Sequence, residues 1–320
     1  MPFVTRWIAG LGAALVCIAP ALADTYPSRP VTLIVPFAPG ASADGLARLV
    51  ANELSTRLGQ TVVVENRPGA GGATGLMALA RATPDGYTLS MGATGAIAVN
   101  PHIAGSAPLN PEKELAPVAK LADIPLVFVT GAKTNLKTPA DLQRASAATA
   151  GGLSFGTTGA NSAMHLSGEL FNRMTGSKMV HIAYKGSAPA VTDVLAGNIP
   201  LAIVDLTSAA PHIKAGTLLA VGTTSPQRVS SAPEIPTLAE AGLPGYAATA
   251  WMGIFAPAGI APEVSQRISD EIGAIMAKPE VQERARALGT EPAFLGAKDF
   301  GVFLTQASNQ WRDLVKSVNP

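Results

Sequence analysis

Residues 31–66 read VTLIVPFAPGASADGLARLVANELSTRLGQTVVVEN, and this stretch decides the fold class. Residues 31–37 are apolar and rich in β-branched side chains, which predicts a strand. Apolar residues then recur at helical spacing from Leu46 to Leu54, which predicts a helix. A second β-branched run, 61–65, predicts another strand. Strands that alternate with helices are typical of α/β proteins, in which helices cover both faces of a mainly parallel sheet.

The same alternation continues along the rest of the chain. A chain of 320 residues exceeds the size at which a single core tends to divide in two. The apolar run 125–130 is placed to cross from one sheet to a second, and 251–255 is placed to return. We therefore expect two lobes, each a mainly parallel sheet flanked by helices. The first lobe comprises residues 24–125 and 248–320, and the second comprises residues 126–247.

The N-terminus has the features of a secretory signal peptide. Arg6 precedes an apolar run, 7–22, and the small residues that end at Ala23 suit a cleavage site. The run is short for a membrane anchor and rich in glycine and alanine. We expect residues 1–23 to be removed on export. The only cysteine, Cys17, lies in this segment, so the exported chain has neither disulfides nor thiol chemistry.

Charge and motif content argue against several classes of function. The chain has 23 basic and 22 acidic residues with no long run of either sign, so nucleic acid is not expected as a partner. The four histidines are too scattered for a recognisable zinc motif, and no metal is expected. The glycine-rich stretch 69–74 has Thr74 where a dinucleotide-binding loop needs its third glycine. We expect no cofactor and no enzymatic activity.

Three loops stand where open α/β sheets bind ligands, beyond the carboxyl ends of strands. Residues 37–44 and 156–162 each lead from a predicted strand into a predicted helix, and 93–95 follow a third strand. Small residues let backbone N–H groups approach a ligand, and a helix N-terminus attracts a carboxylate without a basic side chain. The candidate ligand-binding residues are Phe37, Ala38, Gly40, Ala41, Ser42, Asp44, Thr94, Thr157, Thr158, Gly159, Asn161, Ser162, His165 and Asp205.

Two of these candidates have a second interpretation. His165 lies in the first turns of its predicted helix, a place more typical of a packing or hydrogen-bonding residue than of a catalytic base. Asp205 ends a predicted strand, where its carboxylate could accept a hydrogen bond from a ligand amine or hydroxyl. It could equally cap the helix that begins near Thr207.

Four motifs carry a resemblance to a known family. They are VPFAPG at 35–40 with Asp44, ENRPGAGG at 65–72, FGTTGANSAMHL at 155–166, and AYKG at 183–186 with Ala190. Together they resemble the Bug receptors of tripartite tricarboxylate transporters, and further similarity near Pro84 and Trp251 extends the match over essentially the whole exported chain. Ala41 departs from the family pattern, because many relatives have a second glycine there, and the shape of the first loop is accordingly in question.

The resemblance implies a type II-like, two-lobed periplasmic binding protein that closes on its ligand and delivers it to a membrane permease. A ligand carboxylate is held in this family mainly by backbone amides and hydroxyls of one loop from each lobe. By position the family's ligand-binding residues correspond to Phe37, Ala38, Ser42 and Asp44, and to Thr157, Thr158, Asn161 and Ser162, with Thr94 and Asp205 less directly placed. A monomer located in the periplasm is expected.

Two other functions stay open at this point. The chain could be the ligand-binding component of a membrane sensor rather than of a transporter. A hydrolase or isomerase on the same architecture would need a base in the cleft, for which His165 and Asp205 are the available pair. The ligand is expected to be a small carboxylate, with Phe37 as an apolar wall. A monocarboxylate or a water-bridged diacid is favoured, since no basic side chain is clearly placed for a second carboxylate.

Overall fold

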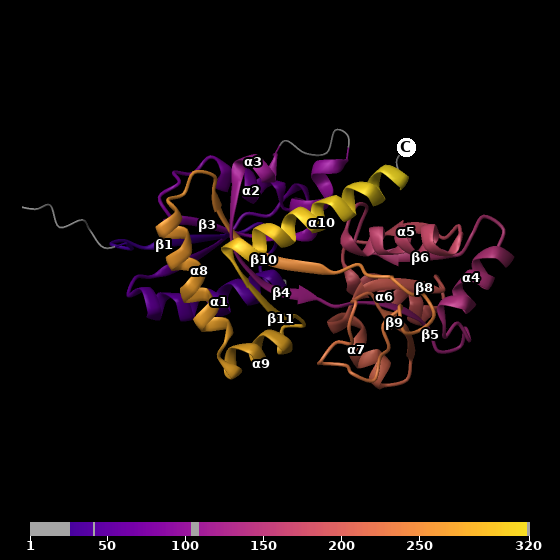
Figure 1. Ribbon diagram of the computed structural model, residues 1–320. Helices are drawn as coiled ribbons and strands as arrows, with labels where there is room; N and C mark the ends of the chain where they lie inside the picture. The colour runs from indigo at the N-terminus through magenta and orange to yellow at the C-terminus, as the bar shows by residue number, and fades with distance from the viewer. Residues whose placement is uncertain (1–25, 41, 104–108, 319–320) are drawn as a thin grey trace, which may run out of the picture.

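The structure is a computed structural model that describes residues 26–40, 42–103 and 109–318. The predicted signal peptide and the candidate residue Ala41 lie outside the described residues. Two separate sheets, of six and five strands, are each flanked by helices (Figure 1). The prediction of a two-lobed α/β protein is therefore confirmed.

The six-stranded sheet has the order β11-β4-β10-β3-β1-β2. Its strands are β1 (Val31–Val35), β2 (Val62–Asn66), β3 (Thr88–Ala93), β4 (Leu115–Ile124), β10 (Ala250–Pro257) and β11 (Glu291–Gly296). Only the β1–β2 and β1–β3 pairs are parallel, while β10 is antiparallel to β3 and β4, and β11 is antiparallel to β4. The expectation of a mainly parallel sheet is thus wrong for this lobe. β4 carries the chain out of the sheet and β10 brings it back, so these neighbours run in opposite directions.

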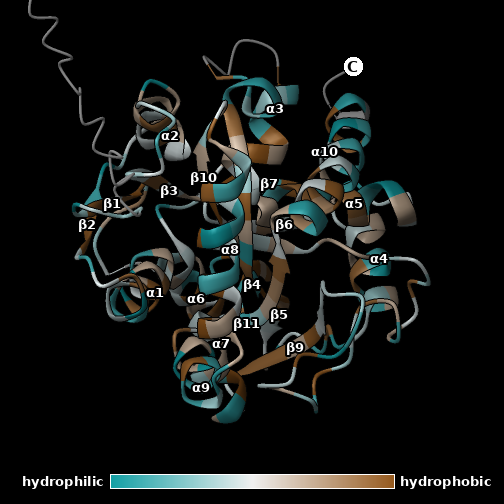
Figure 2. Cartoon of the chain, turned by 60° about the vertical axis from the view of Figure 1, so that its left-hand side comes forward, coloured by the Kyte–Doolittle hydropathy of each residue, from teal (hydrophilic) through white to brown (hydrophobic). Residues whose placement is uncertain are grey.

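Both faces of this sheet are covered by helices. One core cluster joins α1 (Ser42–Leu58), α8 (Pro262–Met276) and α9 (Pro279–Ala287) to one face, and Figure 2 shows α8 with hydrophilic residues along its outer side. The other face is covered by helical segments on the opposite side, which are η1 (Ala70–Gly72), α2 (Ala73–Ala80), η2 (Gly95–Val99), η3 (Asn100–His102), α3 (Pro111–Glu114) and α10 (Ala297–Val318). Burial on both faces explains the nearly continuous apolar sequence of β1 and β10.

The five-stranded sheet has the order β7-β6-β8-β5-β9. Its strands are β5 (Leu126–Gly131), β6 (Ser154–Thr157), β7 (Val180–Ala183), β8 (Leu201–Asp205) and β9 (Leu218–Thr223), and its helices are α4 (Pro139–Ala148), α5 (Ala163–Thr175), α6 (Ser187–Ala196) and α7 (Leu206–Lys214). β6 runs parallel to β7 and β8, whereas β5 is antiparallel to both of its neighbours. This sheet too is mixed rather than mainly parallel, because β5 enters from the other lobe.

Local sequence signals start the helices of the second lobe. Thr138 caps α4 by accepting a hydrogen bond from the backbone N–H of Asp141, and the Asp141 carboxylate accepts one from the backbone N–H of Thr138. This reciprocal capping box is typical of a threonine that precedes an acidic residue by three positions, and Pro139 occupies the first turn of the helix. Ser162 caps α5 by accepting a hydrogen bond from the backbone N–H of His165, at 3.2 Å. The start of α5 is therefore fixed at one end of the candidate loop.

The two lobes are joined by three segments. The chain passes from β4 to β5, and returns from β9 to β10. In Figure 1, α10 runs in yellow from the first sheet toward α5 of the second, and Trp311 of α10 belongs to the same core cluster as Phe171 of α5. No helix in the described part of the chain is both long and apolar enough to span a bilayer.

Close packing around β10 makes a first prediction. A Cβ on Gly253 would lie 2.4 Å from the ring of Phe300 and 2.8 Å from the carbonyl oxygen of Ala119. We expect Gly253→Ala to lower the free energy of unfolding by about 1–3 kcal/mol, because the backbone oxygen cannot yield. Gly301→Ala is the control, since its Cβ would meet nothing nearer than Pro117 at 3.7 Å. Equal urea midpoints for the two variants would contradict this account of the packing.

Candidate ligand-binding site

The first candidate loop is held in place by the buried carboxylate of Asp44, which is 5% exposed. Asp44 accepts hydrogen bonds from the backbone N–H of Gly40 (3.0 Å), from Nε of Arg48 (3.1 Å) and from Nδ2 of Asn66 (2.9 Å). Asn66 also donates to the carbonyl oxygen of Phe37, at 3.1 Å. Both ends of residues 37–40 are therefore tied to the start of α1 and to the end of β2.

Asp44 is ionised over the whole physiological range. Burial raises the pKa of its carboxyl, but hydrogen bonds from Arg48, Gly40 and Asn66 outweigh burial and lower the pKa to about 2. Arg48 lies 3.0 Å from the carboxylate and neutralises its charge. Asp44 thus shapes the loop, and its oxygens are already engaged with three donors.

The glycine-rich segment between β2 and α2 packs against this first loop. Gly72 has a φ of +104°, and a Cβ there would lie 3.4 Å from Cβ of Ala96 and 3.6 Å from the ring of Phe37. The absence of a side chain lets Phe37 and η2 approach each other across Gly72. Since Ala96 is two residues after Thr94, the first and third candidate loops are neighbours.

Thr94, in the third candidate loop, is hydrogen-bonded to the strand that returns from the second lobe. Its hydroxyl accepts a hydrogen bond from the backbone N–H of Trp251 at 2.7 Å, and lies 3.4 Å from the carbonyl oxygen of the same residue. Ala250, the adjacent residue of β10, belongs to a small core cluster with Leu126 and with Ala163, the first residue of α5. The crossing strand β10 therefore leads from the third loop of the first lobe to the cluster at the start of α5.

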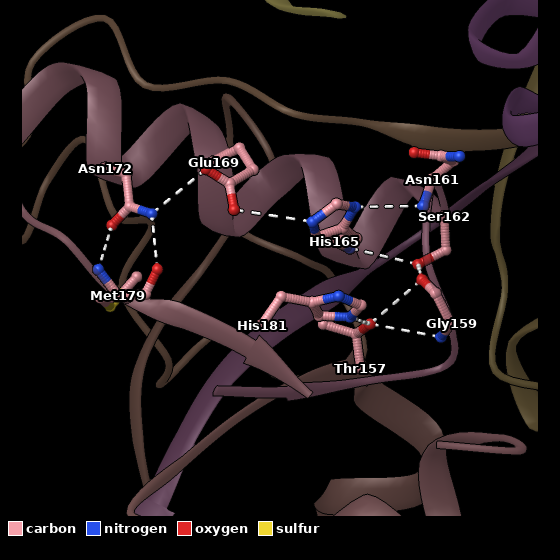
Figure 3. A network of polar contacts seen from close by, with 9 residues as sticks. All are labelled: Thr157, Gly159, Asn161, Ser162, His165, Glu169, Asn172, Met179 and His181. Atoms are coloured by element: carbon pink, nitrogen blue, oxygen red, sulfur yellow. Dashed lines mark hydrogen bonds and ion pairs between the residues drawn. The ribbon is translucent and has the colours of Figure 1, made fainter. Parts of the chain in front are cut away.

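The second candidate loop, 157–162, is closed by its own hydroxyl groups (Figure 3). Thr157 is fully buried, and its Oγ1 accepts from the N–H of Gly159 at 3.3 Å. Ser162 donates from its hydroxyl to the carbonyl oxygen of Gly159, at 2.8 Å. The hydroxyl of Thr158 lies 3.3 Å from Sδ of Met164. The side-chain amide of Asn161 points away from this network in Figure 3.

Two histidines, His165 and His181, contact this loop, and the carboxylate of Glu169 lies beside His165. His165 Nδ1 accepts from the backbone N–H of Asn161 at 3.0 Å, and its Nε2 lies 3.5 Å from Oε1 of Glu169. The His165 and His181 rings lie 3.9 Å apart between centroids, and His181 Nε2 is 2.6 Å from Oγ1 of Thr157. These residues are not arranged as metal ligands, and no group of three or more histidine, cysteine or acidic residues in the described chain is.

Burial and contacts between neighbouring side chains shift the pKa values of His181 and Glu169 in this cluster. Burial and the neighbouring His165 lower the pKa of His181 to about 4, so its ring is neutral near pH 7. Burial raises the pKa of Glu169, but hydrogen bonds from His165 and Asn172 outweigh it and hold the pKa below its usual value. The loop is thus supported by a neutral His181 and an ionised Glu169.

Asp205 caps a helix. Its carboxylate accepts from both the backbone N–H and the hydroxyl of Ser208, each at 2.9 Å, and so caps α7. It also accepts a short hydrogen bond from the hydroxyl of Ser187 at the start of α6. Of the two interpretations left open by the sequence, the structure shows the cap. A ligand-binding role for Asp205 stays a prediction.

Backbone donors remain available on both loops. Among the described residues, the N–H groups of Thr158 and Ala160 make no hydrogen bond, and neither do those of Ala38 and Ser42. The basic side chains beside the first loop are occupied, since Arg48 binds Asp44. Arg67 likewise forms an ion pair with Glu65, at 2.7 Å. The site thus offers amides to an anion.

Several supporting residues were missed by the sequence analysis, namely Arg48, Asn66, His181, Ser187 and Trp251. The signal for Asn66 was its place in the ENRPGAGG motif at the end of β2. Strand β2 pairs with β1, and Asn66 lies opposite Val35 in that register. An amide side chain at this register position reaches the loop that follows β1, which only the strand pairing reveals.

The Asp44 network makes a second prediction. Asp44→Asn would present an NH₂ group to Arg48 and Asn66, which are themselves donors, and would leave buried groups unpaired. We expect a loss of about 1–3 kcal/mol in the free energy of unfolding, measured by urea denaturation at pH 7. The control is Asp270→Asn on α8, whose carboxylate accepts only from the exposed Gln266. A loss for Asp44→Asn no greater than for this control would refute a supporting role for Asp44.

The neutral His181 makes a third prediction. Because its pKa is about 4 in the folded chain and near 6.5 when exposed, the unfolded chain binds more protons between these values. The free energy of unfolding should therefore fall as the pH drops from about 6.5 to about 4. His181→Gln keeps an acceptor near Thr157 and cannot titrate. Denaturation at several pH values should show a shallower fall for this variant, and identical slopes would exclude His181 as the source.

Comparisons with known proteins place the chain in a family. The family model described as the tripartite tricarboxylate transporter family receptor, TctC, matches residues 46–319. The protein BugT of Bordetella pertussis is 36% identical over 98% of this chain and 97% of the relative. A protein encoded in the tcbD-tcbE intergenic region of Pseudomonas sp. strain P51 is 35% identical over 91% of this chain and 87% of the relative.

Solved structures agree with this match. Rpa4515 of R. palustris with adipate has a TM-score of 0.81 at 31% identity, covering 92% of this chain and 98% of that one. The periplasmic binding protein BugD has a TM-score of 0.77 at 31% identity, with 92% and 99% covered. MatC from Rhodopseudomonas palustris with bound malate has a TM-score of 0.76 at 27% identity, with 91% and 100% covered.

These matches confirm the resemblance drawn from the four motifs, and the expectation of a binding protein rather than an enzyme. The chain belongs to the receptor family of the tripartite tricarboxylate transporters.

Proposed function

We propose that this chain captures a small carboxylate between its two lobes and delivers it to the membrane permease of a tripartite transporter. The observation that carries the proposal is that β10 connects loops of the two lobes, since Trp251 binds Thr94 and Ala250 shares a core cluster with Ala163 at the start of α5. Family membership supports the transport role. Adipate and malate in two related structures support the ligand class.

The physical basis is anion binding by helix N-termini. Helices α1 and α5 have 17 and 13 residues; α1 begins within the first candidate loop, at Ser42, and α5 begins directly after the second. The first-turn N–H groups of a helix have no partner within it and carry partial positive charge, so each helix start attracts an anion to the loop beside it. We propose that the carboxylate is bound from one lobe by the N–H groups of Ala38 and Ser42, and from the other by those of the loop residues Thr158 and Ala160.

The other candidate residues fall into two groups, those proposed to meet the ligand and those proposed to shape the loops. Phe37 packs on Gly72 beside the first loop and is proposed as the apolar wall of the site. Asn161 has a side chain that points away from its own network and is proposed to meet the ligand. The remaining candidates are proposed to shape the loops rather than to hold the ligand, and these are Gly40, Asp44, Thr94, Thr157, Gly159, Ser162, His165 and Asp205.

Asp44 is a negative charge at one of these helix starts and would by itself repel a carboxylate. Its ion pair with Arg48 and its hydrogen bond from Asn66 offset this charge. The loop therefore gains an internal anchor without losing its attraction for an anion. This arrangement favours recognition by amides over recognition by a guanidinium group.

The proposal also covers export, location, oligomeric state and the bounds of the two lobes. We propose that the chain is exported by cleavage after Ala23, acts in the periplasm, and works as a monomer with residues 24–125 and 248–320 as one lobe and 126–247 as the other. The six-stranded and five-stranded sheets divide at the crossings that follow Ile124 and precede Ala250, which supports these boundaries.

A panel of acids tests the proposal. Adipate, malate and a set of aliphatic and aromatic monocarboxylates are added to protein that has been unfolded, stripped and refolded. A true ligand at about 100 times its Kd should stabilise the fold by about 2.7 kcal/mol and raise Tm by several degrees. If no carboxylate raises Tm, and calorimetry detects no binding, the proposal is wrong.

A matched pair of variants locates the site. Ala160 and Ala148 are both exposed, the first on the candidate loop and the second at the end of α4. Ala160→Trp should weaken binding of the best acid at least about tenfold, a cost near 1.4 kcal/mol, because the ring fills the space in front of the loop. Ala148→Trp should bind like the unmodified chain. Equal affinities would place the ligand elsewhere.

A further inference from the structure

One residue of the second loop has a backbone conformation that needs support. Asn161 has a φ of +61°, in the left-handed region that residues other than glycine seldom adopt. Its backbone N–H donates to Nδ1 of His165 at 3.0 Å. This N–H group therefore has its hydrogen-bond partner within the protein and is not available to a ligand. The hydrogen bond holds Asn161 in its unusual conformation.

The same hydrogen bond determines the tautomer of His165. Because Nδ1 accepts, the ring proton lies on Nε2, which faces Glu169 at 3.5 Å. Glu169 is in turn bonded to Nδ2 of Asn172 at 3.2 Å. Asn172 accepts from the N–H of Met179 at 2.9 Å, and donates to its carbonyl oxygen at 3.0 Å. Figure 3 shows this line of contacts from the loop to the segment before β7.

The opposite end of the loop is held by the second histidine. His181 on β7 places Nε2 2.6 Å from Oγ1 of Thr157, and the same oxygen accepts from the N–H of Gly159 at 3.3 Å. The two imidazoles lie face to face with centroids 3.9 Å apart, inclined by 31°. Each end of the loop therefore contacts one imidazole, and the imidazoles contact each other.

We propose that His165 and His181 are positioning residues of the ligand site, acting through the loop backbone rather than on the ligand. His165 holds Asn161 so that the neighbouring N–H groups of Thr158 and Ala160 face outward, and His181 holds Thr157 beneath them. Glu169 keeps His165 in the tautomer that accepts. This inference rests on the proposed function, because it assumes that the loop binds a carboxylate.

Two substitutions of His165 separate this role from general packing. The Oδ1 atom of asparagine can occupy the place of Nδ1, whereas the longer side chain of glutamine reaches the place of Nε2. His165→Asn therefore keeps the acceptor for Asn161, and His165→Gln keeps only the contact with Glu169. Adipate and malate are the probes, and Kd is measured by calorimetry.

We expect His165→Asn to bind within about threefold of the unmodified chain, and His165→Gln to lose about tenfold in affinity, the effect of one unpaired amide. A purely structural histidine predicts equal losses, so equal Kd values for the two variants would overturn the inference. Thermal denaturation shows whether each variant is folded. His102→Gln, in η3, controls for loss of a histidine elsewhere.

A second measurement needs no ligand and tests the geometry alone. The ¹⁵N chemical shifts of the His165 ring should report an unprotonated Nδ1 and a protonated Nε2. Exchange of the Asn161 amide hydrogen should be slow in the unmodified chain and in His165→Asn, and faster in His165→Gln. A protonated Nδ1, or equal exchange in all three, would overturn the positioning role. If no acid binds, the proposed function fails, and amide exchange still decides whether His165 holds the backbone of Asn161.

Discussion

The hydrogen bond from the backbone N–H of Trp251 to the hydroxyl of Thr94 holds the loop after β3 against the strand that returns from the second lobe. Strand β10 returns from the second lobe and is inserted between β3 and β4 of the first. Its first residue, Ala250, belongs to the core cluster that contains Ala163 at the start of α5. Consecutive residues of one strand therefore connect the loop after β3 to the region where α5 begins.

The charges near the site follow from this arrangement. The basic side chains at the first loop are paired with acidic ones, Arg48 with Asp44 and Arg67 with Glu65. Attraction for an anion then depends on backbone amides that the loops leave unpaired, and on side chains that hold those amides in place. The buried carboxylate of Asp44 supports the first loop, and the neutral ring of His181 supports the second. Each lobe thus uses a polar side chain to shape a loop, the buried Asp44 in one and the half-buried His181 in the other.

Local signals were sufficient to predict much of this fold. Helical spacing predicted α1, and the alternation of strands with helices predicted two sheets flanked by helices. Strands β4 and β11 were missed, because β4 contains Pro117, Lys120 and Asp123 and lacks an apolar pattern of its own. Mixed strand directions were missed because they depend on where the chain leaves a sheet and re-enters it. Bonds such as Thr94 to Trp251 join residues 157 positions apart, and no local pattern encodes them.

The central claim is that amides from both lobes bind one carboxylate, and a crystal structure of the chain with a bound acid tests it most directly. The account predicts a carboxylate within hydrogen-bond distance of the backbone N–H groups of Ala38 and Ser42 on one side and of Thr158 and Ala160 on the other. Another hollow of the described chain lies between α7 and α9, where Lys214 and Arg286 line it. A carboxylate found there, with both loops empty, would contradict the account.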